Sequence, residues 1–220
     1  AKRIGASGVI RLNKQNVQVI VGTRAELIAK AMTEVMAKGP IAASAPAAAP
    51  EKSQQTAPEK VKGNAVLSLI APVSGEVYSL DQVPDEAFSS RIVGDGIAIK
   101  PTSSEVVAPA AGTIVKIFPT NHAFCLETAN GVELIVHMGI DTVALNGEGC
   151  ERLVEEGAEV EAGTPILKLD LPFLEANAKS MISPVIISNI DDFAGVEILA
   201  KGQVIAGETV IYHVLKSVSY

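Results

Sequence analysis

From Asn64 onward, short apolar runs alternate with clusters of Gly, Pro, Asn and Asp that recur every eight to twelve residues or so. Short strands separated by such turn residues are typical of β-sandwiches and barrels. We therefore predict an all-β fold, an antiparallel sandwich or barrel, for residues 64–220. One short helix is expected after Asp170, which can cap it, with Pro172 in its first turn. The expected strands are 75–78, 96–99, 112–118, 124–127, 132–136, 166–169, 185–187, 196–199 and 210–214.

Two short patterns occur twice in this part of the chain. Ala71-Pro-x-x-Gly75 recurs as Ala108-Pro-x-x-Gly112. Val160-x-Ala-Gly-x-x-Ile166 recurs as Val204-x-Ala-Gly-x-x-Val210. Turns of small residues that lead twice into paired strands indicate a duplicated half-barrel motif.

The first 63 residues follow a different pattern. Alternation over Val17–Val21 predicts a strand, and apolar residues at helical spacing after Thr23 predict a helix that ends before Gly39-Pro40. This βα unit, residues 1–36, is too small to bury a core by itself. Residues 37–63 are rich in Ala and Pro and have no periodic apolar positions, which is typical of a linker. We therefore place a domain boundary there, before a domain at 64–220.

Composition and charge exclude several classes of protein. Residues 64–220 hold eight Lys and Arg against 21 Asp and Glu, a net charge of −13, so nucleic-acid phosphates would be repelled. Neither a membrane-spanning run nor a signal peptide is recognisable, and because the sequence opens within an element we expect it to be a fragment. Cys125 and Cys150 form no disulfide framework, and we expect reduced thiols.

The chain has three histidines, and two of them are predicted to meet. His122 and His137 flank the turn Ala129-Asn130-Gly131, and Asn-Gly is a strong hairpin signal. If the turn centres on Asn130-Gly131, residues pair where their numbers sum to about 261, which places both imidazoles on adjacent strands and on one face. His213, in the last expected strand, has no polar neighbours in sequence and is interpreted as structural or exposed.

Two imidazoles at one point suit two kinds of chemistry. A neutral imidazole is a nucleophile at phosphorus, and a second one can hydrogen-bond the phosphoryl oxygens, with Thr120 placed to orient His122. The alternative is a metal site, for which Asp141 or Glu133 would be the third ligand. The spacing alone leaves the phosphoryl relay, the metal site and a purely structural role for the pair open.

Other chemistries lack their motifs. No GxSxG serine motif and no GxxxxGK[ST] phosphate loop occurs. A biotin- or lipoate-type carrier domain would suit the repeated turns, but it needs a Lys in an exposed MKM or DKA turn, whereas Lys168 lies in a strand pattern. A zinc-binding hydrolase of similar β architecture needs HxxxD and HxH elements; His137 and Asp141 have the HxxxD spacing, but no HxH element occurs.

The segments around both histidines resemble a known family. TNHAF (120–124) and VHMGIDTV (136–143) are similar to the glucose-type enzyme IIA domain of the bacterial phosphoenolpyruvate-dependent sugar phosphotransferase system, and the similarity extends over residues 64–215. Residues 1–36 resemble the end of a IIB domain, so the joint pattern is most similar to the C-terminal part of an N-acetylglucosamine-specific permease. The resemblance implies a β-sandwich with a duplicated hybrid motif. Further similar segments are VPDEAFSS, VGDGIAIKP, APAAGTIVKIF, LNGEG, RLVEEGAEVEAGTPIL and SPVIISN.

The resemblance also implies roles for individual residues. His137 would be the phosphorylated nucleophile, and His122 would contact the phosphoryl group. Thr120 would orient His122 through a hydrogen bond, and the Gly139 carbonyl would orient His137. The chain would be an incomplete phosphotransferase component, because the IIB cysteine would precede residue 1 and neither Cys125 nor Cys150 could replace it.

The implied partners are proteins. The donor would be phospho-HPr, the acceptor a cysteine of the IIB domain, and sugar uptake would belong to the membrane IIC domain. No cofactor would be required, although zinc could bind His122 and His137 at a partner interface. The domain would be cytoplasmic and tethered to the inner membrane in the full-length permease. An apolar-rimmed partner surface is expected from Phe88, Phe118, Phe124, Met138 and Ile140, with Asp141 beside them.

Overall fold

The structure, a computed structural model, describes residues 8–11, 17–20 and 64–216. Every strand pairing in it is antiparallel. The main sheet has eight strands in the order β11-β7-β8-β9-β13-β5-β4-β15. Their bounds are β11 Glu159–Val160, β7 Gly112–Ile117, β8 Ala123–Glu127, β9 Glu133–His137, β13 Ser183–Ile187, β5 Asp95–Pro101, β4 Gly75–Ser79 and β15 Gln203–Val204.

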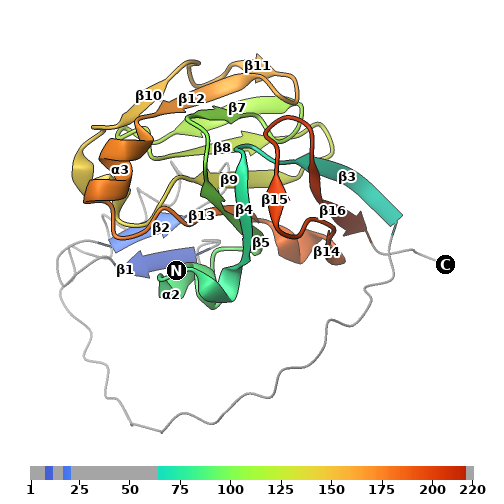
Figure 1. The fold of residues 1–220 in the computed structure, drawn as a ribbon. Helices are drawn as coiled ribbons and strands as arrows, with labels where there is room; N and C mark the ends of the chain where they lie inside the picture. The colour runs from blue at the N-terminus through green and yellow to red at the C-terminus, as the bar shows by residue number, and fades with distance from the viewer. Residues whose placement is uncertain (1–7, 12–16, 21–63, 217–220) are drawn as a thin grey trace, which may run out of the picture.

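Two three-stranded sheets accompany the main sheet, and together they form a β-sandwich (Figure 1). One has the order β10-β12-β6 and the other β14-β16-β3. A separate pair, β1 and β2, lies in the first 20 residues. The bounds are β10 Cys150–Arg152, β12 Pro165–Leu169, β6 Glu105–Val107, β14 Gly195–Ile198, β16 Val210–Lys216, β3 Asn64–Ile70, β1 Gly8–Arg11 and β2 Val17–Ile20.

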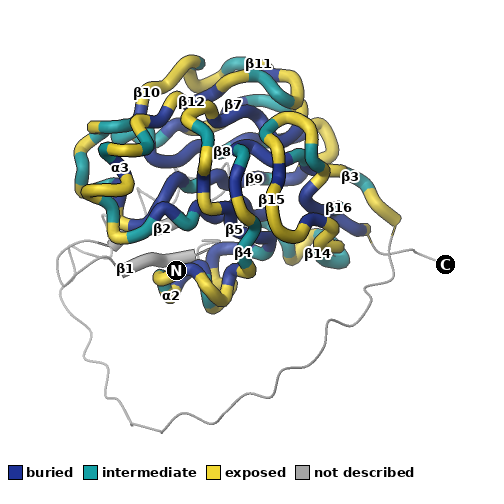
Figure 2. The backbone as a smooth tube through the Cα atoms, in the orientation of Figure 1, coloured by how far each residue is buried: buried dark blue, intermediate teal, exposed yellow. Residues whose placement is uncertain are grey.

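The main core lies between the sheets and consists largely of Val, Ile and Leu (Figure 2). Residues of β9 alternate between its two sides: Leu134 and Val136 are fully buried in this core, whereas Ile135 points to the other face. A second, smaller core covers that other face. It forms where the segment with η2 (Leu80–Gln82) and α2 (Glu86–Ser89) folds over the sheet. The two faces of β9 are therefore both covered, and a residue at its end lies between two packed layers.

The repeated patterns form two equivalent corners. Val160 of β11 pairs with Gly112 of β7, and Val204 of β15 pairs with Gly75 of β4 in the same way. The turn glycines repeat each other as well. Gly163 N donates to Ala108 O at 2.8 Å, and Gly207 N donates to Ala71 O at 2.9 Å. The predicted duplication of a half-barrel motif is confirmed.

The nine strands expected after residue 64 are all present, with boundaries shifted by a few residues. Strand β2 also confirms the expected strand at 17–21. The expected helix is α3, Leu171–Asn177, and the Asp170 side chain caps it by accepting from Phe173 N at 3.2 Å. The strands β1, β3, β6, β10, β11 and β15 were not expected, and neither were α2, η2, η3 (Thr142–Leu145) and η4 (Ile190–Asp192).

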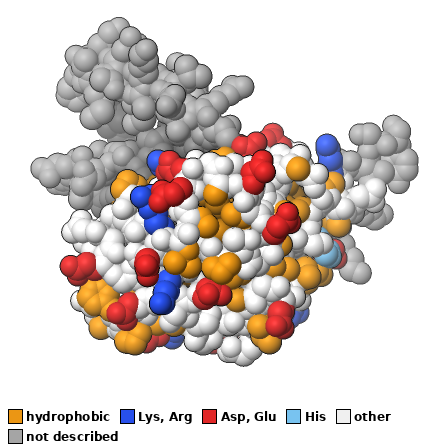
Figure 3. Space-filling view, turned by 90° about the horizontal axis from the view of Figure 1, so that it is seen from above, with side chains coloured by type: hydrophobic (Ala, Val, Ile, Leu, Met, Phe, Trp, Pro, Cys, Tyr) orange, Lys and Arg blue, Asp and Glu red, His pale blue; other side chains and the backbone are white. Residues whose placement is uncertain are grey.

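Two expectations concern residues that the structure does not describe. The helix after Thr23 and the linker at 37–63 lie outside the described residues, so the domain boundary stays a prediction. Within the described residues, no helix has the length and apolar character needed to cross a membrane. Acidic side chains are spread over the face seen in Figure 3, in keeping with the net charge of this part of the chain.

Candidate active site

His137 is the last residue of β9, on the strand face that carries Ile135. Its ring is half-buried and packs at an angle of 62° against Phe88, with 5.3 Å between the ring centroids. Phe88 belongs to α2 and to the second core. The fold therefore holds one side of the His137 ring with apolar contacts and leaves the other side to polar groups.

The loop after β9 fixes the orientation of the His137 ring. Nδ1 of His137 lies 2.8 Å from the Gly139 carbonyl oxygen, so Nδ1 carries the proton and donates it. Gly139 has φ +68°, and a Cβ there would lie 2.9 Å from Ser180 O. Its own N–H donates to Ser183 Oγ at 3.0 Å. The acceptor carbonyl is therefore held in place, in the position that the predicted role of Gly139, orienting the His137 ring, requires.

His122 lies in the turn between β7 and β8, directly before Ala123. Its ring centroid is 4.9 Å from that of His137, so the predicted meeting of the two imidazoles is found in the structure. Thr120 Oγ1 and His122 Nδ1 form a hydrogen bond, as expected. The Phe118 ring packs against His122 at 5.3 Å between centroids. Nε2 of His122 is buried and has no hydrogen-bond partner among the described residues.

The hairpin register differs by one residue from the prediction. Ala123, and not Phe124, lies opposite His137. The loop has three residues, 129–131, closed by a hydrogen bond from Thr128 N to Val132 O, and Gly131 is left-handed at φ +74°. The hairpin is therefore centred on Asn130 and not between Asn130 and Gly131, so paired residue numbers sum to 260. In this register, strand alternation would place His122 and His137 on opposite faces, so it does not explain why they share one.

Both imidazoles are held in their neutral form. Burial, together with the smaller effect of the neighbouring His137, lowers the pKa of His122 to about 3. Burial also lowers the pKa of His137, against the opposing effects of the Gly139 carbonyl, Asp85 and Asp141. A neutral imidazole keeps one nitrogen lone pair free, so His137 is ready to act as a nucleophile through Nε2 at neutral pH.

The buried His122 predicts a loss of stability in acid. The unfolded chain takes up this proton near pH 6.5 and the folded chain only at about pH 3, so between these values the unfolded state binds more protons. The free energy of unfolding should therefore fall, by roughly 3 kcal/mol between pH 6.5 and pH 4 at about 1.4 kcal/mol per pH unit. Urea unfolding of the wild type and His122→Gln at both pH values measures it. The variant should lose less, and an equal loss in both chains contradicts the assignment.

The predicted partner surface is largely wrong. Phe124 and Met138 are fully buried in the main core, while Ile140 and Phe88 are 2% and 3% exposed in the second core. The reason is that β8 and the loop after β9 direct these side chains inward, one sheet face to each core. Phe118 is half-buried beside His122, and Asp141 is exposed. Of the six residues, these two retain access to a partner.

The alternative metal ligands do not converge. Within residues 64–216, no group of three or more His, Cys, Asp or Glu side chains could hold a metal ion, so Asp141 and Glu133 do not complete a site with the histidines. Two imidazoles are half of the four ligands that a structural zinc requires. Cys150 and Cys125 are free, and burial raises their pKa values to about 11 and 12, respectively. Lys168 lies inside β12, as its pattern predicted.

The sequence interpretation missed two residues near the histidines. Asp85 caps α2 by accepting from Ala87 N at 2.9 Å, and its charge acts on His137. The N-cap spacing in Pro84-Asp85-Glu86 was a signal for it. Asn121, immediately before His122, has left-handed backbone at φ +51°. Asparagine tolerates this conformation better than most residues, but the sequence alone gave no reason to expect it there.

The sequence of this chain matches the model of a known protein family. The family model for the phosphoenolpyruvate-dependent sugar phosphotransferase system, EIIA 1, matches residues 67–193, more than half of the chain. The chain therefore belongs to this family of phosphotransferase-system EIIA domains. All of the described site residues lie within the matched segment.

Particular relatives narrow the comparison. The chain is 60% identical over 217 residues to the PTS system N-acetylglucosamine-specific EIICBA component of Escherichia coli (strain K12), which covers 98% of this chain and 34% of that protein. It is 56% identical over 136 residues to the glucose-specific EIIA component of Borreliella burgdorferi, covering 62% of this chain and 72% of that protein. The solved structure of glucose permease IIA from Mycoplasma capricolum matches with a TM-score of 0.62 at 39% identity, over 66% of this chain and 94% of that one. The chain thus spans about a third of the length of the EIICBA relatives.

Proposed function

We propose that this chain is a phosphohistidine carrier in which His137 accepts a phosphoryl group on Nε2 and passes it on. The observation that carries the proposal is the protonation pattern of the two rings: His137 has its free lone pair on Nε2, whereas His122 has its proton on Nε2. His137 Nδ1 is committed to the Gly139 carbonyl, which leaves Nε2 as the nucleophile. With Thr120 donating to Nδ1 of His122, the proton of that neutral ring lies on Nε2. This Nε2 is buried and has no hydrogen-bond partner among the described residues, and the centroids of the two imidazole rings are 4.9 Å apart. This Nε2–H would donate to a phosphoryl oxygen.

The transfer has two steps, and each is a displacement at phosphorus. In the first, the N–P bond of phospho-HPr breaks as a bond from His137 Nε2 to phosphorus forms. In the second, that bond breaks as a cysteine thiolate of a IIB domain attacks, and the His137 ring returns to its neutral state with Nδ1 still bound to Gly139. Asp141 and Phe118 are the accessible neighbours that a partner would meet. The phosphorus–nitrogen bond of phosphohistidine is energy-rich, so we propose that transfer of the phosphoryl group needs no cofactor.

The wider context follows from the relatives. We propose that the chain serves sugar uptake and phosphorylation together with IIB and membrane IIC domains, on the cytoplasmic side of the inner membrane. N-acetylglucosamine is the proposed sugar, because the 60% identical Escherichia coli relative is specific for it. Any zinc at His122 and His137 would take its remaining ligands from a partner, since the described residues supply only these two imidazoles near each other.

The test is phosphorylation by a reconstituted relay. The chain, incubated with radioactive phosphoenolpyruvate, enzyme I and HPr, should take up about one phosphate per chain in an acid-labile, base-stable form. Omitting HPr should prevent the labelling. Acid-stable labelling, or labelling by ATP alone, would contradict the proposal.

A further inference from the structure

The direction of the His122 side chain is not explained by the strand that follows it. Along β8, Phe124 and Leu126 are fully buried in the main core. Since side chains alternate along a strand, His122 would follow Phe124 toward that core. Its ring instead lies beside His137, which is opposite Ala123 on the other face of the same strand pair. A local departure from strand geometry must therefore turn the imidazole.

That departure is at Asn121. Its backbone is left-handed, with φ +51°, and its N–H donates to Phe118 O at 2.7 Å, which closes the turn after β7. Its side chain makes a second, distant connection. Nδ2 donates to the carbonyl oxygen of Cys150 at 3.2 Å, across 29 residues of sequence. The residue before His122 is therefore held both by its backbone and by its amide.

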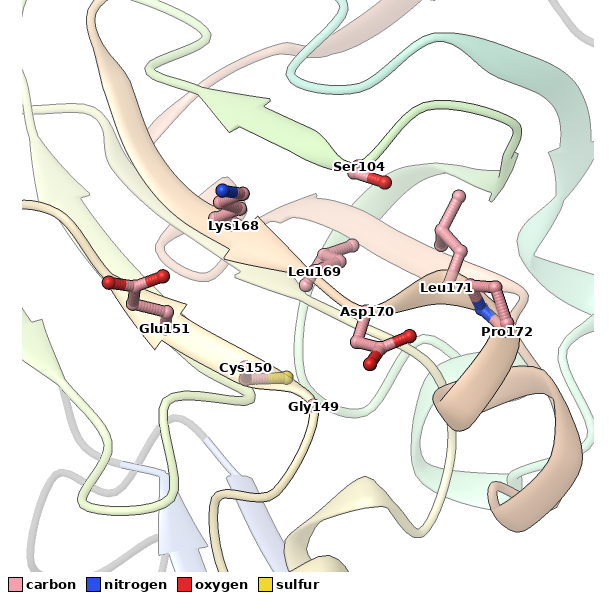
Figure 4. Close-up of a pocket in the computed structure, with 9 residues that line it drawn as sticks. All are labelled: Ser104, Gly149, Cys150, Glu151, Lys168, Leu169, Asp170, Leu171 and Pro172. Carbon is pink, nitrogen blue, oxygen red and sulfur yellow. The ribbon is translucent and has the colours of Figure 1, made fainter.

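The acceptor of the amide is itself fixed. Cys150 begins β10 and pairs with Leu169 of β12, and Asp170 N donates to the neighbouring Gly149 O at 2.9 Å. Figure 4 shows Gly149, Cys150 and Asp170 close together, and all three line a pocket of about 450 Å³. No histidine lines that pocket. The fixed strand edge beside this pocket carries the carbonyl oxygen that accepts the hydrogen bond from the Asn121 amide.

We propose that Asn121 is a positioning residue for His122: its left-handed backbone and its amide bond to Cys150 O turn the His122 ring toward His137. The inference rests on the proposed function, because it matters only if His122 donates to a phosphoryl group. Asparagine meets both requirements, since it tolerates left-handed backbone and its amide is a donor. Glycine would keep only the backbone conformation, aspartate would keep the conformation without the donor, and alanine would keep neither.

The test measures phosphoryl transfer from His137 to IIB in Asn121→Asp, Asn121→Gly and Asn121→Ala. Because misplacement by about 1 Å can cost about 100-fold, we expect Asn121→Ala to slow this step by at least ~10-fold, with the other two variants between it and the wild type. Asn146→Ala is the matched control: Asn146 is left-handed at φ +54°, but its amide bonds only locally, to Ala144 O at 3.4 Å. It should transfer at the wild-type rate.

Two further measurements separate positioning from a general loss of structure. In the background of His122→Gln, Asn121→Ala should cause no additional slowing, because Asn121 acts through His122. In ¹⁵N-labelled chains without any phosphate, Asn121→Asp should shift the His122 ring nitrogen signals and leave those of His213 unchanged. Multiplicative slowing with His122→Gln, or wild-type rates with unchanged His122 signals, would overturn the inference. Failure of the proposed function would look different: the wild type itself would take up no phosphate, while the nitrogen signals would still report on the position of His122.

Discussion

His137→Gln is expected to abolish phosphorylation of the chain. Glutamine can still donate a hydrogen bond toward the Gly139 carbonyl, and its volume is close enough to that of histidine to maintain the contact with Phe88. Its amide nitrogen has no lone pair available for attack on phosphorus, so the nucleophile is lost while the fold remains. We expect labelling from phospho-HPr to fall by at least ~1,000-fold, to below detection, because no other group in the site can form the bond.

The third histidine provides the control for this variant. His213 is half-buried in β16, and its Nδ1 lies 2.9 Å from Oγ of Ser68 in β3, a polar neighbour that is distant in sequence. His213→Gln should label like the wild type. If His137→Gln still incorporated a full equivalent of acid-labile phosphate while folded by circular dichroism, His137 would not be the carrier.

His122→Gln is expected to accept phosphate and pass it on poorly. His137 and its tie to Gly139 are unchanged in this variant, so the nucleophile is intact. The lost group is the Nε2–H donor toward the phosphoryl oxygens, and removal of one such donor typically costs ~100-fold to ~1,000-fold in rate. Quenched-flow transfer from the phosphorylated chain to a IIB domain should show this slowing.

Thr120→Val is the companion measurement. Valine keeps the shape of threonine but removes the hydroxyl that bonds His122 Nδ1, so the His122 ring loses its orientation without losing its donor. Transfer to IIB should be slowed, but by less than in His122→Gln. If His122→Gln transferred its phosphoryl group to IIB at the normal rate, the role that we assign to His122 would be wrong.

The sequence was sufficient to predict most of the longer strands, although not the seven-residue β3, and the meeting of the histidines. A short apolar run bounded by turn residues is a clear signal, and β5, β7 and β16 all carry it. Strands β11 and β15 have two residues each, which is too short for any periodicity. They form because the glycine corners at Gly163 and Gly207 bring them against β7 and β4. Such pairings depend on tertiary contacts that no local pattern records.

The errors at the site have two physical origins. Phe124 and Met138 flank the histidines in sequence, yet strand alternation places both side chains in the main core. The hairpin was placed one residue out of register because a three-residue loop and a two-residue loop share the same Asn-Gly signal. The close approach of His122 and His137 was correct, but it depends on the left-handed turn at Asn121 and not on parity along the strand.

The most direct test of the central claim is to locate the phosphoryl group on the phosphorylated chain by ³¹P and ¹⁵N nuclear magnetic resonance. The geometry predicts a phosphorus–nitrogen coupling to Nε2 of His137, with its Nδ1 still protonated and donating to the Gly139 carbonyl. The signals of His122 should shift without any coupling to phosphorus. A phosphoryl group on Nδ1 of His137, on His122 or on His213 would contradict the account.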